Sequence, residues 1–371
     1  MPKKCIKEDD EKMFESERVT VYDWLRLIAT IFVVIGHSAY LDIHTTYGGV
    51  SYTLPENLSK VYDWAVFVWL RYMSGWVYGF HMPLFFMLSG AVLGLRPIGT
   101  FDKVFRSKVK RLLIPYFIYG WLFMFPVKRL GNFYDNDSMK EAMRGFLSGA
   151  DSGHLWFLTA LFWCIIVFAL YKKILDMLKI QSIYIVLLVG GLIQLNVSYI
   201  PFDVLGLKKG LGYMFYFALG YIFEIERSSN RNERLEGTKK VLLSFIIVCG
   251  IEILNKRFEI LDTFFTIIVG SFMTYLLADI LDRGFKGVKE NRCWKFVITN
   301  LFYVYLFHDP MEYIVLRLFI GQDWLRTGIG CIAYTVCRTI VIFVISLILG
   351  EMIGQIKKYF RDHKCLGLFR I

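Results

Sequence analysis

No two cysteines in the sequence have the spacing of a zinc site or a dithiol redox centre. The seven cysteines are scattered, four of them within apolar runs and three in polar segments. Thiols held in lipid or in a reducing cytoplasm remain free. The sequence therefore predicts neither a disulfide framework nor a metal site.

Motifs of soluble catalysis are also absent. The sequence contains no GxSxG elbow, no Walker phosphate-binding loop and no HExxH zinc motif. The common soluble hydrolases, P-loop kinases and zinc proteases are therefore excluded. The net charge of +11 raises nucleic acid as a partner. However, the Lys and Arg residues lie in short segments between apolar runs, which is typical of a membrane topology signal.

Apolar residues dominate the composition. Hydrophobic residues make up 56% of the chain and aromatic residues 17%, which is more than a soluble domain of this length carries. They occur in runs of roughly 16 to 24 residues, enough to cross a hydrocarbon core of about 30 Å. Residues 1–18 are polar, and no small-residue cleavage site follows the first apolar run, so we expect no cleaved signal peptide. The predicted fold class is an all-α, polytopic membrane protein.

Ten apolar runs predict a bundle of transmembrane helices in one membrane domain, 19–350, between polar segments 1–18 and 351–371. One short run is bracketed by Pro115 and Pro126. Residues 61–74 are apolar but charged in places, so they either lie in the outer interface or extend the second helix. The predicted helices span 19–40, 76–95, 112–126, 154–171, 181–199, 209–224, 240–255, 261–281, 296–319 and 329–350.

Basic residues favour one side of the membrane. With the N-terminus inside, the inner segments carry most of the Lys and Arg, including six between 96 and 111, whereas the outer segment 128–153 balances its basic residues with acidic ones. The positive-inside rule then predicts that both termini are cytoplasmic. We expect a multi-pass protein of the plasma membrane.

Ionisable residues within the predicted helices mark candidate sites, because burying a charge in hydrocarbon is costly. Arg26 and His37 are eleven residues apart, so they share a helix face at a separation of roughly 16 Å. Arg26 is expected near the inner boundary of the membrane, so His37 lies eleven residues above that boundary. His308 lies about twelve residues from the inner end of its helix, and thus at matched depth. His81 and His154 come from two further helices and lie in the same outer half. The four histidines are either hydrogen-bond donors between helices or the core of a site.

A basic cluster precedes the third predicted helix. Lys108, Lys110 and Arg111 lead directly into Pro115, in the densest basic segment of the chain. The cluster is either a topology signal or a site for a phosphate-rich ligand that approaches from the cytoplasm. Arg338, in the last predicted helix, is expected to neutralise a carboxylate or to cap a helix break.

Five stretches stand out in order along the chain: YDWLR at 22–26 with His37, FHMPLFF at 80–86 with Ser89, KRLLIPY at 110–116, HLWFL at 154–158 and, more weakly, NLFYVYLFH at 300–308. Together they resemble acyltransferase family 3, the membrane-bound acyltransferases that modify surface sugars and related substrates. The resemblance covers about 19–350. Many members have two arginines where this chain has Lys108 and Arg111, which weakens bidentate recognition at Lys108.

The resemblance implies that an acyl group, commonly acetyl, passes from cytoplasmic acyl-CoA to a hydroxyl of a cell-surface glycan or its precursor. His37 would be the general base or a transient acyl carrier, with Arg26 orienting the donor. His308 would orient His37 or stabilise the oxyanion. The coenzyme A phosphates would bind at Arg111, assisted by Lys108 and Lys110. Further pocket candidates are His81, Ser89, His154 and Trp156.

Two alternatives concern the acceptor side. Some relatives carry an additional hydrolase-like domain outside the membrane, whereas here only a short basic segment follows residue 350. The resemblance then implies direct transfer or transfer to a separate protein. The alternative function is a transporter or flippase with an intramembrane histidine site. The implied partners are membrane lipid, acyl-CoA and a hydroxyl acceptor, without nucleic acid or a metal.

Overall fold

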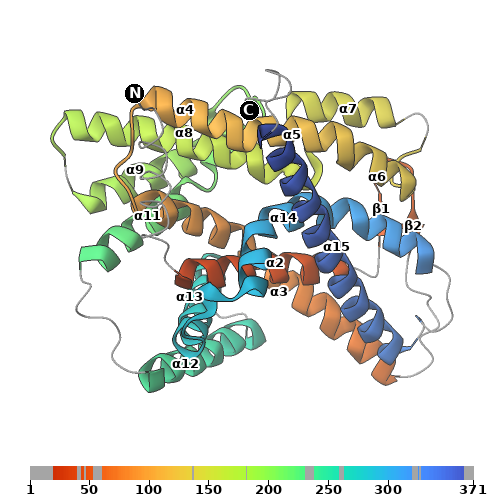
Figure 1. The fold of residues 1–371 in the computed structure, drawn as a ribbon. Helices are drawn as coiled ribbons and strands as arrows, with labels where there is room; N and C mark the ends of the chain where they lie inside the picture. The colour runs from red at the N-terminus through yellow and green to blue at the C-terminus, as the bar shows by residue number, and fades with distance from the viewer. Residues whose placement is uncertain are drawn as a thin grey trace.

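The computed structural model of the protein describes residues 20–39, 43–45, 47–52, 61–135, 138–180, 182–229, 238–258, 263–319, 325 and 327–362. Most of these residues are helical (Figure 1). The α-helices are α2 (Thr20–Ser38), α3 (Val61–Gly94), α4 (Phe101–Lys108), α5 (Ile114–Tyr119), α6 (Phe125–Leu130), α7 (Met139–Ser148), α8 (Trp156–Met177), α9 (Ile183–Leu195), α10 (Leu207–Leu211), α11 (Met214–Ser229), α12 (Thr238–Phe258), α13 (Thr263–Gly284), α14 (Arg292–Phe319) and α15 (Gly328–Asp362).

Shorter elements complete the described chain. The π-helical segments are η1 (Val109–Leu113) and η2 (Gly120–Met124), and the 3₁₀ turns are η3 (Gly153–Leu155), η4 (Val197–Tyr199) and η6 (Val288–Glu290). Two-residue strands β1 (Ile43–His44) and β2 (Ser51–Tyr52) pair antiparallel after α2. The prediction of an all-α membrane protein is confirmed, and these strands are a minor addition to it.

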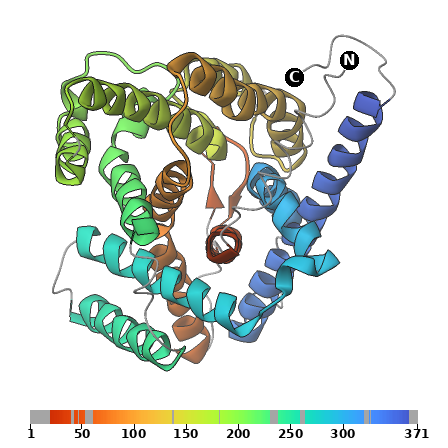
Figure 2. The ribbon, with the colours of Figure 1, turned by 60° about the vertical axis from the view of Figure 1, so that its left-hand side comes forward.

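Helix α2 is the centre of the molecule. It packs against α3, α13, α14 and α15, and Figure 2 shows it end-on with the other helices around it. Ala29 and Val34 are fully buried on it. A helix buried on several sides is expected to be apolar around most of its circumference, so the buried polar residues Asp23, Thr30 and Ser38 of α2 need partners within the protein.

Glycines allow α3 and α11 to pack at backbone distance. A Cβ added to Gly90 of α3 would lie 2.0 Å from Phe217 O, and one added to Gly220 of α11 would lie 1.8 Å from Met87 O. Only glycine permits such an approach, as is common between membrane helices. The contact at Gly90 restricts the rotation of α3 about its own axis, and thereby the position of the adjacent Ser89.

The region 101–130 forms one continuous helical stretch through α4, η1, α5, η2 and α6. The prediction of a loop before 112 and of a helix ending at 126 is wrong. Pro115 and Pro126 lie in the first turns of α5 and α6, directly after the two π-helical segments. A π segment changes the local hydrogen-bond spacing, and proline at the start of the following α segment removes no bond that this segment needs.

The remaining predicted helices are found, with altered ends. Residues 61–74 belong to α3 and therefore extend the second helix. Helix α7 was not predicted, because its sequence is polar and only Ala142 and Phe146 are buried on it. The segments 1–18 and 363–371 of the predicted domain scheme lie outside the described residues.

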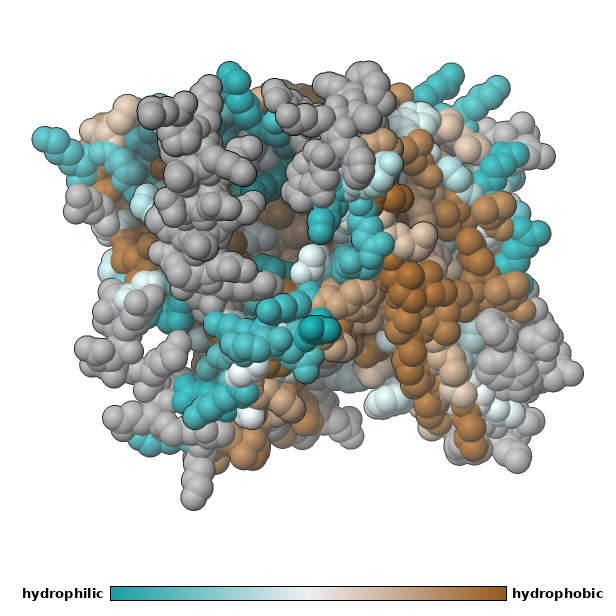
Figure 3. Space-filling model, in the orientation of Figure 1, coloured by the Kyte–Doolittle hydropathy of each residue, from teal (hydrophilic) through white to brown (hydrophobic). Residues whose placement is uncertain are grey.

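The surface is that of a membrane protein. Five helical stretches are long and apolar enough to cross a membrane: Thr20–Ser38, Trp64–Gly94, Met139–Met177, Thr263–Gly284 and Gly328–Phe360. Figure 3 shows apolar residues along α15, where Ile329, Val336, Val344 and Ile348 are exposed. Side chains of this kind are stable on the outside of a protein only in contact with lipid or with another apolar surface. The chain is thus a multi-pass membrane protein, whereas the number of ten spans and their orientation remain predictions.

Candidate functional site

One large cavity contains every residue that the sequence singled out for the site. Its volume is about 1820 Å³, which exceeds the size of common small-molecule pockets. The cavity is lined by Arg26 and His37 of α2, His81 and Ser89 of α3, Lys108 of α4, Lys110 and Arg111 of η1, His154 of η3, Trp156 of α8 and His308 of α14.

His37 and His308 lie side by side, as their matched depth predicts. Their ring centroids are 4.9 Å apart in an edge-to-face arrangement. His308 Nδ1 lies 2.8 Å from Tyr305 O and 3.1 Å from Val304 O. Because carbonyl oxygens only accept hydrogen bonds, Nδ1 carries the hydrogen, and the neutral ring has its lone pair on Nε2.

This tautomer decides between the two roles considered for His308. Its Nε2 atom is buried and makes no hydrogen bond within the described part of the chain. A lone pair at Nε2 can accept a hydrogen bond from a neighbouring group but cannot donate one to an oxyanion. The geometry therefore favours His308 as a partner of His37 over His308 as an oxyanion donor.

His154 is fixed to α14 from both of its ends. Its Nε2 donates to Leu306 O at 3.0 Å, and its backbone oxygen accepts a hydrogen bond from the Tyr305 hydroxyl at 2.7 Å. Leu306 O is available because Pro310, four residues later in α14, has no N–H to bond it. The proline thus provides the acceptor that orients His154.

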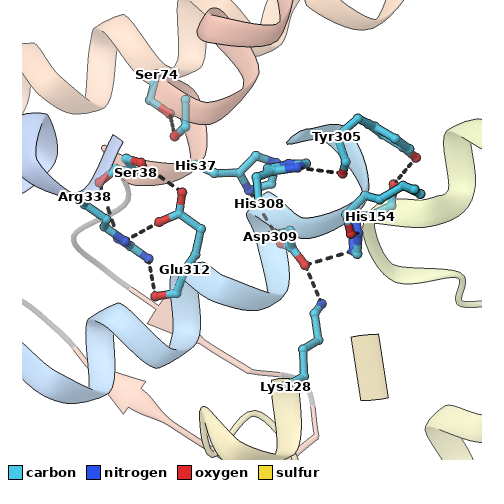
Figure 4. A network of polar contacts seen from close by, with 12 residues as sticks. His37, Ser38, Ser74, Lys128, His154, Tyr305, His308, Asp309, Glu312 and Arg338 are labelled. Atoms are coloured by element: carbon cyan, nitrogen blue, oxygen red, sulfur yellow. Dashed lines mark hydrogen bonds and ion pairs between the residues drawn. The ribbon is translucent and has the colours of Figure 1, made fainter. Parts of the chain in front are cut away.

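Asp309 is the centre of the cluster, and the sequence analysis missed it (Figure 4). Its Oδ2 lies 2.7 Å from Lys128 Nζ and 3.2 Å from His154 Nδ1, and its Oδ1 lies 3.7 Å from His37 Nδ1. The sequence did contain an indication of its role, because Asp309 follows His308 in an apolar run and a carboxylate there needs a partner. Lys128 had been assigned to an outer loop, whereas it is buried in α6.

A second buried ion pair lies beside the cluster. Arg338 of α15 pairs with Glu312 of α14, and the Ser38 hydroxyl donates to Glu312 Oε1 at 2.9 Å (Figure 4). Neither Arg338 nor Glu312 lines the large cavity. Arg338 thus neutralises a carboxylate, which is one of the two roles expected for it.

The other pocket candidates line the cavity wall. His81 is buried, and its Nδ1 donates to Val77 O at 2.9 Å within α3. Trp156 contacts Tyr213, at 5.8 Å between ring centroids, and the Lys209 ammonium lies 5.8 Å from the Trp156 ring. Trp156 and Tyr213 thus form an aromatic part of the cavity wall, and Lys209 packs on Trp156 from outside the lining.

The basic cluster forms another part of the cavity. Lys110 and Arg111 are exposed and Lys108 is half-buried. Within the residues that the structure describes, none of the three makes an ion pair. Burial and the neighbouring Arg111 guanidinium lower the pKa of the Lys108 ammonium. Arg26 is partly exposed and lies 3.4 Å from Asp23 Oδ1. Cations without carboxylate partners on a cavity wall favour an anionic ligand.

Comparison with known proteins gives one match. The model of a family described as an acyltransferase domain matches residues 20–351, which includes every residue of the cavity named above. No curated protein and no solved structure matches the chain.

Proposed function

The chain belongs to this acyltransferase family, and from that premise we propose that it transfers an acyl group, acetyl in the simplest case, from cytoplasmic acyl-CoA to a hydroxyl of a cell-surface glycan or its precursor. It would act in the plasma membrane with both termini in the cytoplasm. Membership of the family does not specify the length of the acyl group or the acceptor. The acetyl group and the glycan hydroxyl are therefore part of the proposal.

One observation carries the proposal: a single cavity connects the cations of the basic cluster with the cluster of His37, His308 and Asp309. Arg26 and His37 are separated by roughly 16 Å along α2. The extended pantetheine arm of coenzyme A is long enough to span such a gap. Phosphates bound at Arg111 would then leave the thioester near His37, with Arg26 beside the arm.

The transfer can be written with His37 as the base. The acceptor hydroxyl gives its proton to His37 Nε2 while its oxygen attacks the thioester carbonyl carbon. The carbon–sulfur bond then breaks, and the thiolate leaves with the proton that His37 returns. If His37 is instead an acyl carrier, its Nε2 attacks the carbonyl first, the carbon–sulfur bond breaks and the coenzyme A thiolate leaves. The acceptor oxygen then attacks the acyl-imidazole, the nitrogen–acyl bond breaks, and the hydroxyl proton goes to the thiolate.

The transporter alternative has less support. A transporter needs no unpaired cations for a cytoplasmic phosphate-bearing donor, and the family is one of acyltransferases. The test is the release of free thiol from acetyl-CoA by the purified protein in lipid nanodiscs, with a membrane extract of the parent strain supplied as the source of acceptor. Thiol release that disappears in His37→Ala supports acyl transfer, whereas its absence in the folded wild-type protein contradicts it.

The acceptor is tested in cells. Surface glycans from a deletion strain and its parent are compared for ester content by mass spectrometry. Loss of acetyl esters in the deletion strain, restored by the wild-type chain but not by His37→Ala, supports a glycan acceptor. Equal ester content in both strains contradicts it and leaves acyl transfer to be judged by thiol release.

A further inference from the structure

Two histidines from different parts of the chain direct the same ring atom at one carboxylate. His37 Nδ1 lies 3.7 Å from Asp309 Oδ1, and His154 Nδ1 lies 3.2 Å from Asp309 Oδ2. We propose, resting on the acyl-transfer function above, that Asp309 is a positioning residue that sets the proton on His37 Nδ1. Lys128 is its counter-ion.

The carboxylate selects the tautomer of His37. A neutral imidazole carries its hydrogen on one nitrogen, and the partner of that nitrogen decides which one. A carboxylate only accepts hydrogen bonds, so it favours the hydrogen on Nδ1 and leaves the lone pair on Nε2. The 3.7 Å separation is longer than a hydrogen bond, and catalytic hydrogen bonds commonly tighten when substrate binds.

His154 holds Asp309 and does not compete with His37. Its Nε2 faces Leu306 O at 3.0 Å and its Nδ1 faces Asp309 Oδ2 at 3.2 Å. Both ring nitrogens of His154 thus face protein oxygen atoms. We therefore assign the support of the carboxylate to His154 and the role of the base to His37.

Lys128 keeps Asp309 in the form that accepts hydrogen bonds. Its ammonium lies 2.7 Å from Asp309 Oδ2 and 4.3 Å from the centre of the Phe133 ring. Both charged side chains are buried, at 4% and 8% exposure. A buried carboxylate without its cation takes up a proton and becomes a donor. Such an acid would favour the opposite tautomer of His37.

The first test is Asp309→Asn, which keeps the size of the side chain. Its amide nitrogen can donate to His37 Nδ1 and so stabilise the unproductive tautomer. We expect kcat for thiol release from acetyl-CoA to fall about 10²-fold or more, with KM for acetyl-CoA unchanged and the pH profile of kcat altered. Asp309→Glu should recover part of kcat.

The matched control is Glu252→Gln. Glu252 is also a buried carboxylate, but it accepts a hydrogen bond from Trp76 at 3.1 Å and does not line the cavity. It should leave kcat and its pH profile as in the wild type. Wild-type kcat and pH profile in Asp309→Asn would overturn the proposal.

A second test needs no turnover. Diethyl pyrocarbonate reacts with an imidazole nitrogen that carries no hydrogen, and mass spectrometry measures the rate at His37. Asp309→Asn should slow that reaction, and an equal rate in both proteins would overturn the positioning role. A wild-type protein that releases no thiol but shows this difference would contradict the acyl-transfer function alone.

The counter-ion is tested by a double-mutant cycle of thermal unfolding. Lys128→Met and Asp309→Asn should each lower Tm, because each leaves one buried charge unpaired. The double variant removes both charges and should melt above Lys128→Met, while its kcat stays as low as that of Asp309→Asn. A double variant that melts no higher than Lys128→Met would overturn the pairing.

Discussion

The Ser38 hydroxyl, on the last residue of α2, donates a hydrogen bond to Glu312 Oε1 of α14 at 2.9 Å. Ser38 follows His37 directly, and Glu312 lies about one turn beyond Asp309. The contact therefore determines how α2 is aligned with α14. His37 is held near Asp309 by a bond that lies outside the cavity.

Arg338→Met should destabilise the protein by about 3–5 kcal/mol, because it leaves Glu312 buried without its cation. Thermal unfolding of the nanodisc-embedded protein measures the effect. The double variant Glu312→Leu with Arg338→Met should recover much of the loss, since both buried charges are then removed. A single variant as stable as the wild type would show that the ion pair is not needed for the fold.

Arg111→Ala should raise KM for acetyl-CoA about 10-fold, the effect of losing one charge-assisted hydrogen bond to phosphate. It should also make KM less sensitive to salt, because screening acts on the charge that was removed. Arg106→Ala is the control, since Arg106 is exposed, bonded to Asp102 at 2.9 Å and outside the cavity. Equal KM values in the wild type and Arg111→Ala would reduce the basic cluster to a topology signal.

The affinity of the donor site for acetyl-CoA should decrease at alkaline pH, because Lys108 loses its charge. Its pKa is lowered by burial and by the Arg111 guanidinium, so its ammonium loses its charge at a lower pH than a free lysine does. A cation lost with rising pH no longer attracts phosphate, and KM for acetyl-CoA should therefore increase as pH rises through that pKa. Lys108→Arg keeps the charge and should remove the increase, which steady-state kinetics across the alkaline range will measure.

Periodicity and length in the sequence were sufficient to predict the helices, because lipid leaves few alternatives to a helix for an apolar run. The exceptions have physical causes. Pro115 and Pro126 were interpreted as helix ends, but a π segment before each proline lets the helix continue. Helix α7 is polar, and its one fully buried aromatic residue, Phe146, stacks on Tyr116 at 4.3 Å between ring centroids.

The site was predictable only in part. Depth along each helix indicated that His37 and His308 are neighbours, because rise per residue is constant. The partner of Asp309 was not predictable, since Lys128 belongs to a helical stretch whose end had been placed two residues earlier. Pro310 gave no sign at the sequence level that it frees Leu306 O for His154. Contacts of this kind depend on how the helices pack against one another, and no local sequence pattern predicts them.

The orientation is tested by cysteine labelling in intact cells with a membrane-impermeant reagent. We expect a cysteine at Lys140 of α7 to be labelled and one at Lys103 of α4 to be protected, because the basic segment should lie in the cytoplasm. Both positions are exposed in the structure, so access to the reagent depends only on the side of the membrane. The opposite labelling pattern would invert the predicted topology and with it the direction from which the donor enters.

His37→Ala should abolish measurable transfer and leave the fold and donor binding nearly intact. Removing a general base typically costs about 10²- to 10⁴-fold in rate, and removing an acyl carrier costs more. His308→Ala should be slower than the wild type by a smaller factor, because His308 acts through His37. Thiol release measures the rates, and calorimetric titration with coenzyme A and thermal unfolding measure binding and folding.

The two roles of His37 differ in what can be trapped. An acyl carrier accumulates an acyl-imidazole when acetyl-CoA is supplied without an acceptor, and rapid quenching followed by mass spectrometry would find the acetyl mass on the peptide that contains His37. A base forms no such adduct. Asp309→Asn should diminish the adduct, since the lone pair on Nε2 is lost from most of the rings. A His37→Ala protein that folds and keeps near-normal turnover would exclude both roles and make His37 a packing residue between α2 and α14.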